Sequence, residues 1–353
     1  MRHLDQYRQN KQNIMNMMES TNMTIATRNS QKGRIPELDI IKFFGILLVV
    51  FGHVTRMYTS VGLITPLESS SVLAITTSII YSFHMPLFVF VSGMTFGVTC
   101  KKKSYQDFTS FARNKAKRLM IPYFVFALFW VLPFMVGFGF RPFLPYLTKG
   151  LLLSLDSRHL WYVWMLFNVF LLFWGLRFLF EKLHIPDWAI LLVSASLFLL
   201  RTKYSVCPYF EINNALTYQF WFTIGYFAIQ YKSTFRTCLP IIVVMGLVGN
   251  YCVGGGKTVY ALTGIYVFYR SAPWLKAITT TRLFDLINKN SFGIYLFHPI
   301  IIYLLFYIFG DLPVNPYLLT ALVFLTSTAA SILLTELVRR KNMGVIIGEK
   351  PIA

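Results

Sequence analysis

An apolar segment near the start of the chain carries three residues that can do acid–base chemistry. The sequence DIIKFFGILLVVFGH, residues 39–53, contains Asp39, Lys42 and His53. In an α-helix, a spacing of eleven residues between Lys42 and His53 is a rise of about 16 Å and a net rotation of about 20°, so both side chains share one face. An imidazole can remove a hydroxyl proton near neutral pH. We therefore predict that His53 is a general base.

The polar residues on this face of the helix can also have a purely structural role. Arg56 follows His53 by three residues and extends the polar stripe. A charge facing lipid near the bilayer centre costs about 3 kcal/mol or more, so the stripe should face a bundle interior or a water-filled cavity. Asp39 and Lys42 can also reach the membrane interface, and a histidine can simply hydrogen-bond a neighbouring helix. For Asp39 both interpretations remain open.

A second polar cluster lies in YSFHMPLFVFVSGMTFG, residues 81–97. His84 stands just before Pro86, a residue that a first helical turn tolerates, and Ser92 lies in the middle of the segment. His84 is a candidate oxyanion donor or an orienting partner for His53. A helix start and a small-residue packing contact explain the same residues equally well.

The chain that must position these residues has the composition of a membrane protein. Of its 353 residues, 56% are hydrophobic and 13% are charged, and the mean hydropathy is +0.56. A soluble domain carries fewer apolar and more charged residues. We predict an all-α fold, a polytopic membrane helix bundle with about 10 transmembrane helices. The candidate spans are residues 43–55, 72–99, 119–140, 160–180, 188–200, 215–231, 239–254, 258–269, 291–309 and 315–338.

The basic residues predict how the bundle is oriented. Most of the 33 lysines and arginines lie in alternate connections between apolar runs, which is typical of cytoplasmic loops rather than of nucleic-acid binding. Residues 1–36 lack the apolar core of a signal peptide and are predicted to be a disordered cytoplasmic tail. Residues 37–338 form the predicted membrane domain and residues 339–353 a cytoplasmic tail. The four cysteines are scattered, and no metal site is predicted.

Five segments, taken in order, resemble one family. The first two, ELDIIKFFGILLVVFGHV and SFHMPLFVFVSG, are specific, and RLMIPY, LWYVWMLF and NSFGIYLFHPII follow later in the chain. Together they are similar to the membrane acyltransferase-3 family, most of all to its fucose 4-O-acetylase-like branch. The resemblance extends from about residue 36 to residue 338.

The resemblance implies a ten-helix enzyme of the cytoplasmic (inner) membrane with both termini in the cytoplasm. Such an enzyme moves an acyl group, usually acetyl from cytosolic acetyl-CoA, to a hydroxyl of a cell-surface glycan or lipid-linked sugar. In the family's first-helix motif, an arginine precedes a histidine by eleven positions; here Lys42 and His53 match them. Lysine keeps the charge but lacks the bidentate fork. The chain has no counterpart of the glutamate that often follows the fourth-helix tryptophan in the wider family.

Donor and acceptor contacts are expected from these matches. Asp39 would orient Lys42, and Lys42 would contact the diphosphate or pantetheine of acetyl-CoA. The basic loop, with Arg113, Lys117 and Arg118, would attract the polyanionic head of CoA, although positive-inside orientation explains its charge as well. Direct attack on the thioester and a transient acyl-histidine remain open.

The acceptor side has weaker candidates. Ser92, Trp161, Trp164 and His298 are expected to line the substrate site, with the tryptophans stacking on a sugar. Aromatic residues also gather at membrane interfaces, and His298 could instead be a helix-packing histidine.

Two other functions place polar residues in such a bundle. A secondary transporter or flippase of a glycan-related substrate would use them as proton or ligand contacts, and a catalytically inactive sensor would bind a lipid-linked glycan. The concentration of polar residues on the first two spans favours acyl transfer. The acceptor, the acyl group and the oligomeric state remain open.

Overall fold

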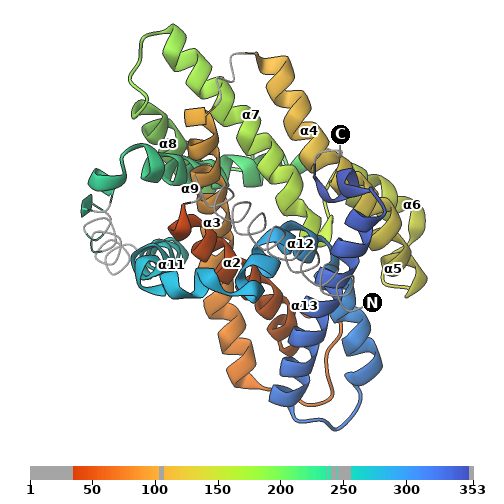
Figure 1. Ribbon diagram of the computed structural model, residues 1–353. Coiled ribbons are helices and arrows are strands. Elements are labelled where there is room, and N and C mark those ends of the chain that lie inside the picture. The colour runs from red at the N-terminus through yellow and green to blue at the C-terminus, as the bar shows by residue number, and fades with distance from the viewer. Residues whose placement is uncertain are drawn as a thin grey trace, which may run out of the picture.

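All regular structure in the described part of the chain is helical. The computed structural model describes residues 35–102, 107–235, 237, 238, 240, 244 and 256–349 (Figure 1). The predicted all-α fold is confirmed. The α-helices are α2 (Pro36–Thr55), α3 (Ser71–Lys102), α4 (Phe108–Phe126), α5 (Leu132–Gly137), α6 (Phe143–Pro145), α7 (Trp161–Lys182), α8 (Ala189–Lys203), α9 (Ile212–Gln230), α11 (Gly256–Ser271), α12 (Arg282–Phe309) and α13 (Pro316–Arg340).

Six helical segments within these ranges are long and apolar enough to cross a membrane. The chain is therefore a multi-pass membrane protein. The six segments are Pro36–Tyr58, Ser71–Cys100, Phe108–Gly137, Arg158–Lys182, Arg282–Phe309 and Pro316–Arg340. The helices α8 and α11 have only 15 and 16 residues. The predicted span at 239–254 and the predicted tail at 1–36 lie almost wholly outside the described residues.

Helix α2 is the centre of the bundle. It packs against α3, α12, α13 and the 3-10 segment η6 (Ala272–Thr280), which surround it in Figure 1. Its apolar side chains Ile41, Ile46 and Val50 are fully buried. Because neighbours enclose this helix on several sides, its polar stripe faces protein rather than lipid, as predicted from its charges.

Helices α3 and α9 cross with their backbones in direct contact. A Cβ atom built on Gly93 would lie 2.0 Å from the carbonyl oxygen of Phe222, and one built on Gly225 would lie 2.0 Å from that of Phe90. Only glycine permits so close an approach, and small residues serve this purpose in membrane helices. This crossing fixes α9 against the helix that carries His84.

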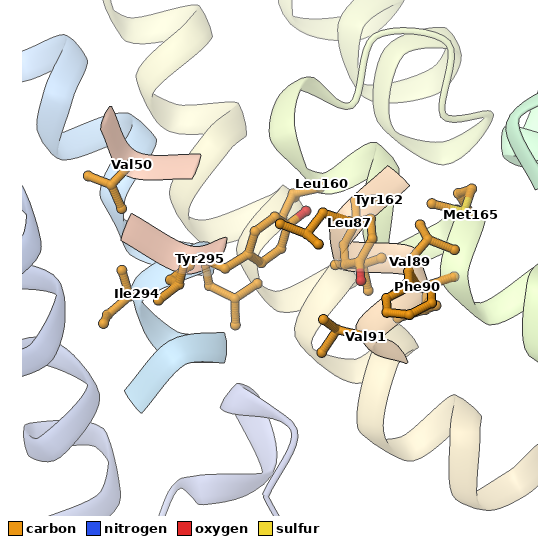
Figure 2. Close-up of a cluster of buried hydrophobic side chains, with 14 of the residues drawn as sticks. Val50, Leu87, Val89, Phe90, Val91, Leu160, Tyr162, Met165, Ile294 and Tyr295 are labelled. Atoms are coloured by element: carbon orange, nitrogen blue, oxygen red, sulfur yellow. The ribbon is translucent and has the colours of Figure 1, made fainter. Parts of the chain in front are cut away.

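A buried apolar cluster joins four parts of the chain around the site. Figure 2 shows buried side chains of one cluster, among them Val50 of α2, Leu87 and Phe90 of α3, and Tyr162 and Tyr295 of α7 and α12. The Tyr162 hydroxyl lies 2.9 Å from Ser92 Oγ. The Tyr295 hydroxyl donates to the backbone carbonyl of His159. The cluster thus holds the start of α7 in place beside α2 and α12.

The C-terminal residues pack on the bundle. Helix α13 continues to Arg340, beyond the predicted boundary at 338, and a short 3-10 helix, η7 (Gly344–Ile347), follows. Arg339 pairs with Glu349 at 2.6 Å. Arg118 Nε donates to the Gly348 carbonyl at 3.3 Å, so the described part of the predicted tail is docked against α4 and α13.

Candidate active site

A cavity of about 700 Å³ lies at one end of the bundle. Its walls come from the end of α2, the first half of α3, the loop before α7, the first turn of α7 and the connection between α8 and α9. Segments far apart in sequence thus meet at helix ends. The histidines and the acidic and basic side chains that line it are His53, His84, His159, Arg56, Arg158, Arg201, Asp156 and Glu211.

Four histidines gather at the inner wall of this cavity. The ring centroids of His53 and His298 are 5.1 Å apart, and those of His159 and His298 are 6.1 Å apart. Tyr81 connects the fourth histidine, His84, to the other three, because its ring centroid lies 6.2 Å from that of His53 and 4.6 Å from that of His84. Helices α2, α3 and α12 and the 3-10 turn before α7 therefore each contribute one imidazole to a single cluster.

Backbone carbonyls define the tautomers of three of these histidines. His298 Nδ1 lies 2.7 Å from the Ile294 carbonyl, and His84 Nδ1 lies 2.8 Å from the Ile80 carbonyl. His159 Nε2 lies 3.1 Å from a carbonyl of α12. A carbonyl only accepts, so each of these nitrogens carries the hydrogen and, in a neutral ring, the other nitrogen is a lone-pair acceptor. In the neutral ring His84 Nε2 is thus an acceptor, which suits the predicted role of orienting His53 better than the predicted role of oxyanion donor.

Several polar atoms of the cluster have no hydrogen-bond partner among the described residues. They include Nδ1 of His53, Nδ1 of His159, Nε2 of His298 and the Tyr81 hydroxyl, all buried. A buried polar group without a partner costs about 1–3 kcal/mol, so such groups cluster where a ligand or a proton is handled. Within the described ranges, no group of His, Cys, Asp or Glu could hold a metal ion.

The loops at the cavity mouth have a strained backbone. Ser154, Arg158, Phe210 and Glu211 adopt φ angles of 58°, 52°, 55° and 58°. All four lie on or beside the cavity wall. Positive φ is costly for residues with a Cβ and persists where surrounding contacts enforce it, as at many functional sites.

Glu211 joins the two loops that form the mouth. Its carboxylate accepts from Ser154 Oγ at 3.0 Å and from Asn214 Nδ2 at 2.6 Å. The side chain is buried, and burial raises the pKa of the Glu211 carboxyl, although the hydrogen bonds partly oppose that shift. The loop before α7 is therefore held to the start of α9 by a carboxyl group that burial pushes towards its neutral form.

The cavity includes some of the residues predicted from sequence. His53, His84 and Trp161 line it, and His298 lies directly behind His53. The side chains of Lys42 and His53 both meet α12, as expected for one helical face, because Lys42 Nζ donates to the Asn288 carbonyl at 2.9 Å. Lys42 itself is not part of the cavity wall.

Other predicted residues lie elsewhere. Trp164 stacks on Phe210, with ring centroids 5.5 Å apart, and Ser92 bonds to Tyr162, so neither lines the cavity. Arg113, Lys117 and Arg118 are exposed on the first half of α4 and are likewise absent from the cavity wall. They remain candidates for CoA only through their charge.

Sequence reasoning assigned no role to several cavity residues. His159 and Arg158 come from RHLW, residues 158–161, where a basic pair directly precedes an aromatic residue in an apolar run. Tyr81 begins the second polar segment. Glu211 is a lone acid between two apolar segments, and nothing in the sequence near it distinguishes it from a loop carboxylate. Only RHLW carried a usable signal.

The helices and the cavity define the class of the protein before any comparison. It is a polytopic membrane protein whose helices enclose a cavity equipped for acid–base chemistry. The chain matches the family model of an acyltransferase domain over residues 35–336, and it belongs to the acyltransferase-3 family. It is thus a membrane-bound O-acyltransferase. No curated protein and no solved structure matches the chain.

Proposed function

We propose that the protein transfers an acetyl group from cytosolic acetyl-CoA to a hydroxyl of a cell-surface glycan or its lipid-linked precursor, with His53 as general base. The observation that carries this assignment is the position of His53. It lies on the cavity wall, its Nδ1 is buried without a hydrogen-bond partner among the described residues, and its ring centroid is 5.1 Å from that of His298. Family membership supports acyl transfer over a transporter or a sensor.

The histidine pair suggests how the base is prepared. His298 Nε2 is a lone-pair acceptor and, like His53 Nδ1, has no hydrogen-bond partner among the described residues. A hydrogen bond from His53 Nδ1 to His298 Nε2, formed when the substrates bind, would leave His53 Nε2 as the basic atom. The acceptor hydroxyl attacks the thioester carbonyl while its proton passes to His53 Nε2. The tetrahedral intermediate then expels the CoA thiolate, which takes up that proton from His53 and leaves as the thiol. Both steps balance without a metal or an oxidant. An acyl-histidine intermediate remains the alternative.

Tyr81 is the proposed donor to the developing oxyanion. The Tyr81 hydroxyl has no hydrogen-bond partner among the described residues, and the Arg56 guanidinium carbon lies 5.5 Å from the centre of its ring. Preorganised donors of this kind stabilise the transition state in a site that excludes water. Tyr81 thus takes the role of oxyanion donor, one of the two roles that the sequence suggested for His84.

The donor would approach from the opposite end of α2. Lys42 lies about 16 Å before His53 along the helix axis, which is comparable to the reach of a pantetheine arm. Arg113, Lys117 and Arg118 belong to a basic segment that would attract the CoA head. In this arrangement acetyl-CoA and the glycan meet at His53 from two sides.

The topology that suits this path has ten crossings. The short helices α8, α9 and α11 and the predicted span at 239–254 would complete the six that the structure shows. The charge bias then leaves both termini cytoplasmic in the cytoplasmic membrane, with the cavity at the far side. We also propose membership of the fucose 4-O-acetylase-like branch, since Lys42 stands where most of the family has arginine.

Release of labelled acetyl into surface glycan tests the proposal. We would compare wild type, His53→Ala and His184→Ala at matched membrane expression, because His184 is exposed in the loop after α7 and serves as a control. Loss of a general base should lower transfer by about 10²–10⁴-fold. Undiminished transfer by His53→Ala, or equal loss with His184→Ala, would contradict the assignment.

A further inference from the structure

The cavity carries more positive than negative charge. Arg56, Arg158 and Arg201 line it, opposed by Asp156 and Glu211. The Glu211 carboxylate oxygens are already occupied, because they accept hydrogen bonds from Ser154 and Asn214. Three guanidinium groups thus face two carboxyl groups in a cavity of about 700 Å³.

The carboxylate of Asp156 is already shared. Its Oδ2 lies 3.0 Å from Arg141 Nε, and its Oδ1 lies 3.4 Å from Arg158 Nε. Arg201 is also occupied, because it donates to the backbone carbonyls of Asn213 and Tyr204. Asp156 therefore cannot neutralise the cavity, and Arg201 serves to hold the connection between α8 and α9.

Arg56 and Arg158 retain unused donors. Arg158 Nη2 is buried without a hydrogen-bond partner among the described residues, and Arg158 Nε, 3.4 Å from Asp156 Oδ1, forms an ion pair there but no hydrogen bond. Arg56 has no carboxylate partner among the described residues, and its guanidinium lies over the Tyr81 ring. A guanidinium can only donate, so these atoms require an acceptor, and a carboxylate or phosphate matches their fork geometry.

Both arginines are next to the catalytic cluster. Arg56 follows His53 by three residues, at the start of the 3-10 segment η1 (Arg56–Tyr58) that continues α2, and residues three apart on a helix have Cβ atoms about 5–6 Å apart. Arg158 directly precedes His159. We propose that Arg56 and Arg158 form an anion subsite for the acceptor, so that the acetylated hydroxyl belongs to a glycan unit with a carboxylate or phosphate within about one sugar ring. This inference rests on the proposed function and narrows its acceptor class.

Equilibrium binding tests the subsite independently of transfer. The full-length protein in lipid nanodiscs is titrated with methyl glucuronide, glucose 6-phosphate, uncharged methyl glucoside and CoA. The variants are Arg56→Gln and Arg158→Gln, with Lys149→Gln as control, because Lys149 is an exposed cation close to the same loops. Thermal unfolding of each variant checks folding, and Arg56→Gln remains informative if Arg158→Gln fails to fold.

We expect one or both acidic sugars to bind at least tenfold more tightly than methyl glucoside. Arg56→Gln and Arg158→Gln should each remove that preference, and Lys149→Gln should preserve it. The stronger of the two acidic probes identifies the anion as carboxylate or phosphate. The proposal fails if the acidic sugars bind no better than methyl glucoside, if Lys149→Gln weakens binding equally, or if CoA is the only probe that depends on Arg56.

The two proposals can fail separately. His53→Ala should abolish acetyl transfer while the acidic probe still binds. If His53→Ala still transfers acetyl and the acidic probe still requires Arg56, the base assignment falls and the subsite stands. If His53→Ala is inactive but probe binding ignores Arg56, the subsite falls and the proposed function stands.

Discussion

At the scale of single residues, the arrangement of histidines decides more than their presence. The sequence suggested that His298 contacts the substrate. In the structure His298 is fully buried, bonds its own helix backbone and has its ring centroid 5.1 Å from that of His53, so it is better placed to act on His53 than on the substrate. It is a positioning residue in our mechanism. A substrate contact and a positioning contact differ in the kinetic parameter they affect.

His298→Ala should lower kcat for acetyl transfer by at least about tenfold and leave the acceptor KM nearly unchanged, because the orientation of His53 is lost while the cavity wall is kept. His298→Gln retains an acceptor group and should recover part of kcat. A raised acceptor KM with unchanged kcat would instead show that His298 binds substrate.

Glu211 predicts a dependence of stability on pH. Its folded-state pKa is raised above the ordinary value of 4.5, so its contribution to stability is fully present below that value and is lost as pH rises through the raised pKa. Glu211→Gln cannot ionise. The melting temperature of the variant, relative to wild type, should therefore rise progressively above pH 4.5, as measured by thermal unfolding in detergent. A difference that is constant with pH would contradict this account.

At the scale of elements, the crossing of α3 and α9 positions both the His84 helix and one rim of the cavity. The contact is made between backbones, which cannot move aside as a side chain can. The sequence shows Gly93 and Gly225 only as two small residues in apolar segments. Their pairing depends on two helices far apart in the chain.

Gly93→Ala and Gly225→Ala should each destabilise the protein by about 1–3 kcal/mol or more, since the added methyl would meet a carbonyl oxygen at 2.0 Å. Gly175→Ala on α7 is the matched control, because nothing lies within 4 Å of its Cβ position. Melting temperatures in detergent measure the effect. Equal stability of the variants at 93 and 175 would argue against a tight crossing.

At the scale of the whole molecule, orientation in the membrane decides which side the acceptor reaches. The cavity includes the connection between α8 and α9, which contains Cys207, whereas Cys238 follows the opposite end of α9. The two cysteines should therefore lie on opposite sides of the membrane.

Variants that keep only Cys207 or only Cys238 test this topology. A membrane-impermeant maleimide should label Cys207 in intact cells and Cys238 only after permeabilisation, because the charge bias places the cavity outside. The reverse pattern would put the cavity in the cytoplasm and would overturn the proposed two-sided path for donor and acceptor.

The sequence by itself determined the fold class, the membrane location and the first candidate base. Apolar runs and sparse charge dictate helices in lipid, because every backbone group must be satisfied within its segment. Helical periodicity then places Lys42 and His53 on one face. These inferences need only local spacing.

Only the tertiary structure decided which residues share the site. His159, Arg158, Tyr81 and Glu211 reach the cavity from separate segments, while Trp164 and Ser92 pack elsewhere. The tautomer of His159 likewise depends on the Leu296 carbonyl, which the fold brings within hydrogen-bond distance, whereas His298 bonds a carbonyl of its own helix. Local periodicity fixes the direction of a side chain relative to its own helix. Which residues surround that side chain depends on how the helices pack, because packing brings together residues more than a hundred positions apart.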